Sequence, residues 1–418
     1  YAVASAYAGP VGEAAAAAKA FIDAGGKGEP WSRLPDDCDV IVDALLGTGL
    51  GRPVTGRWLE AIEQCSAARA PVLSIDIPSG LDADTGRVLG GAILADTTIS
   101  FIALKQGLFT GKGPDQCGSI RFDALGVPAA IYATQILSAR RIDWEKEAEL
   151  VPSRRPSAHK GAFGHVLVIG GAPGMTGAPR LCGEAALRSG AGLVSIATHP
   201  QHAPLVNLGR PELMVHGVSD AGDLRAMAQR ASVVAIGPGL GQGAWARGLL
   251  AAALGLGKPL VVDADALNLL AKDPQRRDDW VLTPHPGEAA RLLDCSVSEI
   301  EADRFAAVVA LQQRYGGGVV LKGAGSLIRA AGHRPTAVCS DGNPGMASGG
   351  TGDALTGVIA ALLAQGLEPE QAAGAGVCLH AAAGDRAARA GQRGMLAMDL
   401  IDHLQTALAE AEHDPACR

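Results

Sequence analysis

Aromatic side chains are scarce in this sequence, where Phe, Trp and Tyr together make up 4% of 418 residues. Long apolar runs are also lacking, since none reaches the roughly 18 residues that a membrane-spanning helix needs. The net charge is −7 and no basic cluster stands out, which argues against nucleic acid and membrane surfaces as partners. These absences predict a soluble globular protein.

The eight cysteines are scattered and form neither a CxxC pair nor a Cys/His cluster. This spacing indicates free thiols in a reducing compartment, with a disulfide or metal role as the alternative. No secretory signal peptide is visible, so we expect a cytoplasmic protein. The chain begins at Tyr1 and not at a methionine, so we also expect residues to precede it.

Glycine, in contrast, is abundant, with 56 residues. Short apolar runs alternate with helix-like stretches, which predicts an α/β protein whose parallel sheets bind ligands beyond the carboxyl ends of their strands. The length predicts two or three domains. A polar, proline-containing stretch at 142–156 predicts a linker. We place the boundary near residue 140, which gives domains 1–140 and 141–418.

The expected elements follow from these runs. In the first domain they are a helix at 12–21, a strand at 39–46, a helix at 57–68, and strands at 71–76 and 97–104. In the second domain strands are expected at 165–169, 193–197, 233–236, 260–263, 280–283 and 318–321. There, a glycine-rich turn at 170–178 is expected to open a helix that runs to about 189, and further helices are expected at 244–254, 287–293, 300–315, 356–364, 372–389 and 397–411.

The most informative stretch is Asn343–Asp353, in which Gly349, Gly350 and Gly352 lead into an apolar helical run. Free N–H groups and the helix dipole at such an N-terminus bind anions. Asp353 would then lie beside the anion, where a carboxylate suits a general base for a hydroxyl attacking phosphorus. A simple helix cap is the alternative, because Asp and Gly are common there.

Polar or glycine clusters also follow other expected strands. They are Gly237–Gly241, Asp263–Asn268, Thr283–Glu288 and Lys322–Ser326 in the second domain, and Asp43, Gly47–Pro53, Asp76 and Ser79 in the first. Each alone could be a structural turn or a loop-capping aspartate. Together they are expected at one edge of a parallel sheet in each domain, where ligands bind. Neither a P-loop nor a dinucleotide-binding glycine pattern is convincing.

The second-domain clusters, together with His159–Gly164, resemble the NAD(P)H-hydrate dehydratase family of the ribokinase-like superfamily over about 150–410. Independently, Val42–Leu50 and Ser74–Leu81 resemble the NAD(P)H-hydrate epimerase family. The resemblance implies a partial Rossmann-like epimerase domain followed by a ribokinase-like α/β domain with a central, mostly parallel sheet. The glycine- and asparagine-rich phosphate loop of the epimerase family is not found before Asp39, so we expect the first part of that domain to be missing.

The implied activity is metabolite repair. Water adds across a nicotinamide ring double bond of NADH or NADPH, and the hydrate exists as R and S epimers at C6. The first domain would interconvert the epimers of NADH-hydrate and NADPH-hydrate. The second would dehydrate the S epimer with ADP as phosphoryl donor, giving AMP and phosphate. The resemblance also implies Mg²⁺, K⁺ and a homo-oligomer, and leaves ADP or ATP open.

The resemblance also implies roles for particular residues. In the second domain, Asp353 would be the catalytic base, and Asp353, Ala178, Gly239, Gly241 and His285 would contact the hydrate. Gly349, Gly350 and Gly352 would hold the phosphate, and Lys322, Gly323, Ala324, Gly325 and Ser326 would contact the nucleotide. Glu288 and Asn343 lie where the superfamily places polar groups near phosphate and magnesium. For His285 alone, a hydrogen-bonded loop histidine is the alternative.

In the first domain the same reasoning implies a hydrate site and a potassium site. Gly47, Thr48, Gly49, Leu50, Gly51, Arg52, Pro53 and Asp76 would bind the hydrate. Asp76 is also the candidate for acid–base catalysis. Asp43 and Ser79 would help to hold K⁺, for which oxygen ligands are chemically suitable.

Two other functions fit parts of these patterns. A vitamin kinase, such as one for hydroxyethylthiazole or pyridoxal, would keep Asp353 and release a stable phosphoester. A non-catalytic nucleotide sensor would have no need of a base at Asp353. The fused epimerase-like domain favours repair over the kinase, and the intact Asp353 argues against the sensor.

Overall fold

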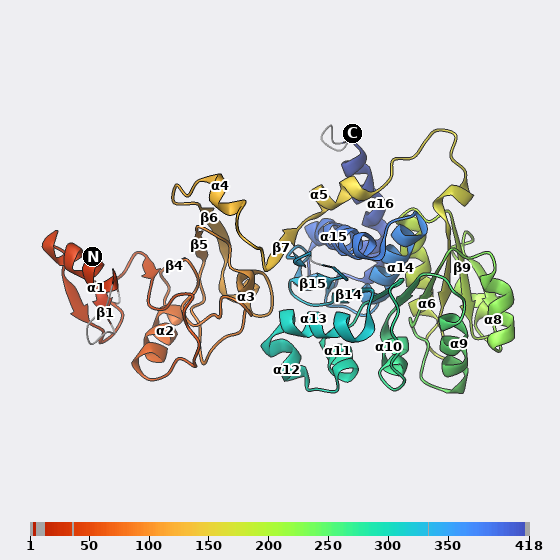
Figure 1. Cartoon of the computed structure of the whole chain (residues 1–418), viewed down its shortest axis with the longest axis horizontal. Helices are drawn as coiled ribbons and strands as arrows, with labels where there is room; N and C mark the ends of the chain where they lie inside the picture. Colours follow the sequence, from red (N-terminus) through yellow and green to blue (C-terminus); the bar gives the residue numbers. More distant parts are fainter. Residues whose placement is uncertain (1–2, 6–12, 36, 333, 414–418) are drawn as a thin grey trace. The chain divides into compact units, whose positions relative to one another are not determined.

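The structure of the chain is a computed structural model that describes residues 3–5, 13–35, 37–332 and 334–413. It divides into two compact units, 1–136 and 137–418 (Figure 1). The division falls close to the boundary near residue 140 that the sequence predicts. Residues 137–140 lie with the second unit because they lead into one of its strands, β7 (Ala139–Ile142).

The first unit contains a small parallel pair of strands and a larger parallel sheet with the order β3-β4-β5-β6. Its strands are β1 (Val3–Ser5), β2 (Gly28–Pro30), β3 (Ile41–Asp43), β4 (Val72–Ile75), β5 (Thr97–Phe101) and β6 (Ser119–Asp123). Its helices are α1 (Glu13–Asp23), α2 (Arg57–Ala67), η1 (Gln106–Phe109), α3 (Gly113–Gln116) and α4 (Ala129–Tyr132).

The core of the first unit forms between this larger sheet and the segments around it. Ile41 of β3 and Val72 of β4 are buried with Ile62 and Cys65 of α2. Asp43 is paired with Ser74 in the β3–β4 register. The register therefore brings the carboxyl ends of β3 and β4 to one edge of the sheet.

The second unit is built on a mixed sheet in the order β10-β9-β8-β11-β12-β13-β14-β15-β16-β7. Its strands are β7, β8 (His165–Ile169), β9 (Leu193–Thr198), β10 (Met214–Gly217), β11 (Val233–Ile236), β12 (Leu260–Val262), β13 (Trp280–Leu282), β14 (Gly318–Leu321), β15 (Ser326–Arg329) and β16 (Thr336–Cys339). Neighbours from β10 to β14 are parallel, whereas β15 is antiparallel to both of its neighbours.

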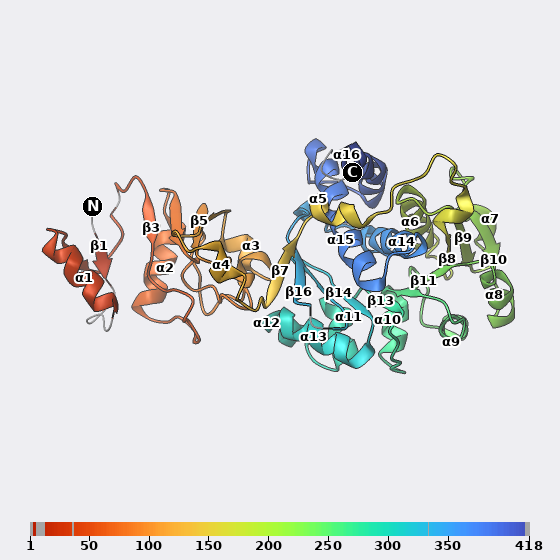
Figure 2. The same cartoon turned by 45° about the horizontal axis from the view of Figure 1, so that its top comes forward.

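Helices cover both faces of this sheet. They are α5 (Trp144–Glu147), η2 (Ala148–Leu150), η3 (Lys160–Phe163), α6 (Gly177–Arg188), α7 (Ala203–Val206), α8 (Ala221–Ala228), α9 (Ala244–Leu254), α10 (Ala264–Leu270), α11 (Pro286–Leu293), α12 (Val297–Ala302), α13 (Arg304–Tyr315), η4 (Pro344–Met346), α14 (Thr351–Ala364), α15 (Pro369–Ala387), η5 (Ala388–Ala390) and α16 (Ala397–His413). Figures 1 and 2 show α14 and α15 on one side of the sheet and α10 to α13 on the other.

Buried apolar side chains explain why α14 lies in the middle of this arrangement. Ten consecutive residues of α14, Ala354–Leu363, are buried, because the helix contacts the sheet on one side and α6, α15 and α16 on the others. An all-round apolar helix is stable only when it is covered all round. The N-terminus of α14 is thereby fixed against the carboxyl edge of the sheet.

Several sequence expectations differ from the structure. The strands expected at 39–46 and 97–104 are shorter, Ile41–Asp43 and Thr97–Phe101, and the helix expected at 372–389 begins at Pro369. The expected linker at 142–156 contains α5, where Trp144 is buried and donates a hydrogen bond to the Ala407 carbonyl of α16 at 2.9 Å. The helix expected at 300–315 is two helices, because Asp303 interrupts the chain and caps α13. The helix expected at 356–364 begins earlier, at Thr351.

Two further predictions from the sequence concern the state of the cysteines and the lack of membrane-spanning helices. Over the described ranges, the cysteines from Cys38 to Cys378 are free thiols, as the sequence predicts; Cys417 lies outside these ranges. In the same ranges, no helix combines the length and the apolar character needed to cross a bilayer.

Candidate active sites

The loops singled out in the second domain meet at one edge of its sheet. Strands β8, β11, β12, β13 and β14 are successive parallel neighbours, so their carboxyl ends lie side by side. The clusters that follow β11 to β14 all leave from this edge, and α14 begins beside them. The predicted α/β architecture, and the grouping of these clusters, are confirmed.

The glycine-rich loop enters α14 through a tight, internally bonded turn. Thr351 Oγ1 donates to the carbonyl of Ser348 at 3.0 Å, and Asn343 Oδ1 accepts from the N–H of Gly345 at 3.0 Å. Ser348 Oγ is buried and has no hydrogen-bond partner among the described residues. An orphan hydroxyl beside free helix N–H groups is what an anionic ligand would satisfy.

Glycine is required at position 350 for two reasons. Gly350 has φ +94°, in the left-handed region, and a Cβ there would lie 2.5 Å from Cδ1 of Leu181 on α6. Any other residue would therefore strain the backbone and push the Leu181 side chain aside. This close approach fixes the loop against the neighbouring helix.

Lys322 joins the sheet edge to the start of α14 through Asp263. The Nζ atom of Lys322 lies 2.8 Å from Oδ1 of Asp263, and Oδ2 of Asp263 accepts a hydrogen bond from Thr356 Oγ1 at 2.8 Å. Burial alone would lower the pKa of Lys322, but the carboxylates of Asp263 and Glu288 outweigh burial and raise it. Lys322 therefore stays a cation at this edge.

The 322–326 loop, which Lys322 begins, is held in place by Arg304. It connects β14 to β15, and the buried guanidinium of Arg304 donates to the Lys322 carbonyl at 3.1 Å. Gly323 has φ +142°, and a Cβ there would lie 2.8 Å from the same guanidinium. Ser326 Oγ closes the turn by donating to the Gly323 carbonyl at 3.2 Å. Ala324 and Gly325 form the tip between them.

Asp353 stands apart from this bonded network. It occupies the first turn of α14, and no hydrogen bond of its carboxylate is found among the described residues. Burial, followed by the charge of Asp263, raises the pKa of Asp353 to about 7 in spite of the opposing effect of Lys322. An unpartnered carboxylate that titrates near neutrality has the properties of a general base.

His285 and Glu288 form a capping box at the start of α11. The Gly287 N–H donates to His285 Nδ1 at 2.9 Å, and the His285 N–H donates to Glu288 Oε2 at 2.9 Å. Burial and then the charge of Lys322 lower the pKa of His285. Burial raises the pKa of Glu288, although Lys322 opposes this effect. In its neutral form, His285 therefore presents an Nε2–H group.

The remaining residues expected to contact the hydrate lie around the turn after β11. Gly239 has φ +57°, and a Cβ there would lie 3.2 Å from the Cβ of Ala178 on α6. Gly241 donates its N–H to Oδ2 of Asp265 at 2.8 Å. Ala178, Gly239 and Gly241 are thus brought together, with Asp265 as the residue that shapes the turn.

Sequence reasoning gave no role to several residues of this site. Asp263 and Asp265 belong to the cluster Asp263–Asn268 that follows an expected strand. Their spacing does not show that Asp263 bonds Lys322 and that Asp265 bonds Gly241. Thr356 lies one helical turn beyond Gly352, a spacing that identifies it once α14 is known to begin at Thr351. His380, whose Nε2 bonds the Thr351 carbonyl at 2.9 Å, is on α15 and had no sequence signal.

The first unit brings Asp43 and Ser79 together, as the sequence predicts. Ser79 Oγ donates to Oδ1 of Asp43 at 2.6 Å, and Oδ2 of Asp43 accepts from the N–H of Ser79 and from Ser74 Oγ, each at 2.8 Å. Leu46 donates its N–H to Ser79 Oγ at 2.8 Å. This ties the beginning of the 47–53 loop to the turn after β4.

Asp76 is held in a constrained conformation beside this cluster. Its φ is +70°, and its Oδ1 accepts from the N–H of Phe101 at 2.9 Å and pairs with Lys105. The 47–53 loop is mostly exposed, and in the described part of the unit no hydrogen bond joins it to Asp76. The grouping of that loop with Asp76 stays a prediction.

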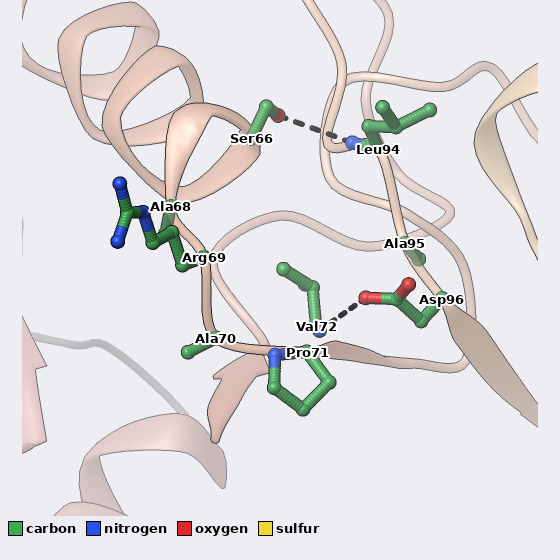
Figure 3. A pocket seen from close by; sticks show the side chains of 9 residues that line it. All are labelled: Ser66, Ala68, Arg69, Ala70, Pro71, Val72, Leu94, Ala95 and Asp96. Carbon is green, nitrogen blue, oxygen red and sulfur yellow. Dashed lines mark hydrogen bonds between the residues drawn. The ribbon is translucent and has the colours of Figure 1, made fainter. Parts of the chain in front are cut away.

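A hollow of about 250 Å³ lies elsewhere in the first unit (Figure 3). It is lined at the amino end of β4, where Val72 donates its N–H to Asp96 Oδ2 at 2.8 Å and Leu94 donates to Ser66 Oγ at 3.1 Å. Two of the polar side chains that line it, those of Ser66 and Asp96, are thus paired, whereas no hydrogen bond of the Arg69 side chain is found among the described residues. Since Asp76 and Ser79 follow the opposite end of the same strand, the hollow is not part of the site.

Both implied cations meet oxygen-rich surroundings. Three carboxylates, those of Asp263, Glu288 and Asp353, act on the single ammonium of Lys322, which leaves an excess of negative charge. The residues that the structure describes contain no group of three or more His, Cys, Asp or Glu side chains converging on a metal position. Mg²⁺ usually binds one or two carboxylates together with waters and substrate phosphates, so these residues fit it. Asp43 and Ser79 are likewise suitable in type for K⁺.

Together, this fold and site define a phosphate-binding α/β enzyme of the ribokinase-like class. Residues 166–406 match the family model described as NAD(P)H-hydrate dehydratase, and residues 10–107 match that of the YjeF-related protein N-terminus. The chain therefore belongs to the NAD(P)H-hydrate dehydratase family, with a YjeF-related domain before the dehydratase domain. The resemblance inferred from the motifs is confirmed.

Known proteins similar to this chain agree over both units. The bifunctional NAD(P)H-hydrate repair enzyme of Coxiella burnetii is 50% identical over 368 residues, which cover 88% of this chain and 75% of that protein. The corresponding Escherichia coli protein is 49% identical over 398 residues, with coverage of 94% and 76%.

Solved structures match the second unit. A ribokinase-like superfamily protein from Enterococcus faecalis is 31% identical, with a TM-score of 0.60, covering 66% of this chain and 98% of that one. The ADP/ATP-dependent NAD(P)H-hydrate dehydratase from Bacillus subtilis is 29% identical, with a TM-score of 0.57 and coverage of 64% and 98%. These matches confirm the ribokinase-like fold.

Proposed function

We propose that this chain repairs hydrated NADH and NADPH. The second unit dehydrates the S epimer with a nucleotide phosphoryl donor, and the first unit interconverts the R and S epimers. The observation that carries the proposal is Asp353, an unpartnered carboxylate with a pKa of about 7 at the N-terminus of α14. The names of the relatives and of the Bacillus subtilis structure support the substrate and the use of ADP or ATP.

The dehydration uses Asp353 as the base. Its carboxylate takes the proton of the C6 hydroxyl as the hydroxyl oxygen bonds to the terminal phosphorus of ADP, and the bond from that phosphorus to the bridging oxygen breaks to release AMP. The phosphate ester that forms is a far better leaving group than hydroxide. Loss of phosphate from C6 and of a proton from C5 restores the ring double bond, so hydrate and ADP give NAD(P)H, AMP and phosphate.

The remaining residues bind and orient. The N–H groups at Gly349, Gly350 and Gly352 hold the transferring phosphate, and Lys322 places a positive charge beside it. Ala178, Gly239 and Gly241 form the wall near the ring, and His285 supplies an Nε2–H donor. Asn343, whose amide caps the loop and bonds Asp385 at 2.9 Å, shapes the approach to the phosphate.

Magnesium is part of the proposal for the second unit. Asp263 and Glu288 are the carboxylates that would hold it together with the nucleotide phosphates. When bound, Mg²⁺ supplies positive charge that offsets the charge of those phosphates. The excess of carboxylate over ammonium charge around Lys322 supports this assignment.

In the first unit, Gly47, Thr48, Gly49, Leu50, Gly51, Arg52, Pro53 and Asp76 would bind the hydrate. Asp76 would act as the acid–base group in the interconversion of the two C6 epimers. Asp43 and Ser79 would help to hold K⁺, which when bound orients oxygen groups of the substrate. The contact between Asp43 and Ser79 supports the pairing of these two residues.

The test follows the near-ultraviolet absorbance of the restored dihydronicotinamide ring. The purified chain is mixed with Mg²⁺, K⁺, ADP or ATP, and a hydrate preparation that contains both epimers. We expect a nucleotide-dependent rise that recovers both epimers. Recovery of the S fraction alone would contradict epimerisation by this chain. No rise, with nucleotide consumed on a vitamin alcohol, would replace the dehydratase proposal with the kinase alternative.

The family also leads us to propose a cytoplasmic enzyme made of several copies of the chain. Sedimentation of the purified protein measures its assembly, and fractionation of cells measures its location. A monomer over the working concentration range would contradict the proposed assembly.

A further inference from the structure

The backbone of Asp76 fixes where its side chain can point. Asp76 follows β4 directly and has φ +70°, which is uncommon for a residue with a Cβ. Its N–H donates to the Ile99 carbonyl of β5 at 2.7 Å, and its Oδ1 accepts from Phe101 N–H at 2.9 Å. Both bonds lead to β5, so β5 is the element that aims this carboxylate.

Lys105 also binds Oδ1 of Asp76. Besides its ion pair with Oδ1 of Asp76, its Nζ donates to the Phe101 carbonyl at 2.9 Å and to Ser100 Oγ at 3.2 Å. The Lys105 side chain is 16% exposed, although lysine usually leaves its ammonium in water. A largely buried ammonium with all three N–H directions in use is fixed in place.

These contacts distinguish the two oxygens of Asp76. Oδ1 receives the Phe101 N–H and Lys105, whereas Oδ2 has no hydrogen bond to any residue that the structure describes. One oxygen is therefore locked and the other is available to a ligand. An exposed surface ion pair would not produce this asymmetry, because both groups would sample several arrangements.

We propose that Lys105 is the positioning residue of the epimerisation site, which locks Oδ1 of Asp76 so that Oδ2 faces the C6 hydroxyl of the hydrate. The inference rests on the proposed epimerase function and adds to it a residue outside the motifs that identified the site. A misplacement of about 1 Å in a catalytic group costs roughly 10²-fold in rate. Loss of Lys105 should have an effect of that order on turnover.

The activity test compares Lys105→Ala with Lys112→Ala. Lys112 is the matched control, because its ion pair with Asp115 at 3.3 Å is exposed on both sides. Conversion of purified (R)-NADH-hydrate to the S epimer is followed by chromatography without nucleotide. For Lys105→Ala we expect kcat to fall roughly 10²-fold with KM little changed. Partial recovery on adding ethylamine, and in Lys105→Arg, is expected because either cation can bond Oδ1.

A second measurement needs no turnover. Hydrogen exchange of the Phe101 N–H reports whether Oδ1 is held, and the Ser119 N–H, bonded to Asp96 at 2.9 Å, is the internal reference. In Lys105→Ala, we expect the Phe101 N–H to exchange about tenfold faster while Ser119 is unchanged. Equal acceleration of both would mean general loosening and would overturn the positioning role.

The two hypotheses fail in different ways. If the unaltered chain does not epimerise, the proposed function of the first unit is wrong, and the Phe101 exchange rate still decides whether Lys105 holds Oδ1 of Asp76. An exchange rate that does not change overturns the inference, as does wild-type kcat in Lys105→Ala. Activity lost without rescue by ethylamine, and with Phe101 exchange unchanged, also overturns it.

Discussion

Lys322 Nζ lies 2.8 Å from Oδ1 of Asp263, and this contact sets the electrostatics of the proposed dehydration site. Asp263 is almost fully buried, and its other oxygen is bonded to Thr356 on α14. The pair therefore links the sheet edge to the helix that carries Asp353. Because Lys322 is already paired with Asp263, it only partly offsets the factors that raise the pKa of Asp353.

Replacing Asp353 tests its role as the base. Asp353→Asn removes the proton acceptor but keeps the shape of the side chain, so we expect dehydration to fall roughly 10²–10⁴-fold. Nucleotide affinity, measured by calorimetry, should be retained, because the phosphate is held by the backbone of the loop. Weakened nucleotide binding with turnover intact would contradict this role.

The pH dependence of dehydration should report the pKa of Asp353. A base acts in its deprotonated form, so kcat/KM for the free enzyme should rise with pH through about 7. Asp263 raises this pKa, and Asp263→Asn should therefore move the rise to lower pH as well as lower the rate. Asp273→Asn, at an exposed position, is the control and should leave the midpoint unchanged. A midpoint that Asp263→Asn does not move would contradict the coupling.

The close contact between α14 and α6 predicts that a glycine-to-alanine change destabilises the unit at this contact, but not in a helix whose glycine faces open space. A Cβ at Gly357 would lie 2.0 Å from the Cys182 carbonyl, so Gly357→Ala should force the helices apart and destabilise the unit by about 1–3 kcal/mol. Gly248→Ala is the matched change, in α9, where nothing lies within 4 Å. It should stabilise by up to about 1 kcal/mol. Denaturant unfolding of both variants checks the difference, and equal effects would rule out the contact as the cause.

Buried strands with abrupt ends were predictable from the sequence. Val233–Ile236 and Gly318–Leu321 are apolar throughout and are followed by glycine or lysine, and both strands have those bounds in the structure. Their carboxyl-end loops were recognisable for the same reason. Candidate site residues were recognisable from the sequence where polar or charged side chains directly follow such a strand or a glycine-rich loop.

Features that depend on distant contacts were not predictable. Strands β7 and β10 have largely exposed or mixed patterns and gain their identity from pairing with β16 and β9. Glu147 reads as part of a polar linker, yet it is buried and bonded to Arg140 at 3.0 Å. Lys105 lies in no motif, because its partner Asp76 is 29 residues away.

Because His380 is buried, we predict that the folded chain loses stability at acidic pH. Burial lowers the pKa of His380 from 6.5 to about 4, so between these values the unfolded chain binds a proton that the native state does not. Stability should therefore fall as pH drops from 6.5 towards 4, by about 2–3 kcal/mol from this group. His380→Gln should flatten that part of the curve, whereas exposed His216→Gln should not. Thermal unfolding across this pH range measures both, and parallel curves would contradict the assignment.

The buried contacts of Trp144 predict that α5, which precedes β8 in the chain, contributes strongly to the stability of the second unit. The Trp144 ring is buried, and its Nε1 bonds the Ala407 carbonyl at 2.9 Å. Trp144→Ala should cost about 3–5 kcal/mol, and Trp144→Phe, which keeps most of the buried ring, clearly less. Calorimetric unfolding of the full chain gives both values. A Trp144→Ala protein as stable as Trp144→Phe would show that the ring contributes little.

The pairing of β7 with β16, and of Trp144 with α16, has a consequence for the order of synthesis. The ribosome makes β7 and α5 first among the elements of this unit, whereas their partners are β16, the last of its strands, and Ala407 in α16, the last of its helices. The nascent unit therefore cannot complete its sheet until β16 has been translated, and Trp144 cannot make its bond to α16 until the last helix has emerged, so completion of the unit is a late, long-range event. Until then the growing chain exposes an unpaired edge, the state in which a cell's chaperones would encounter it.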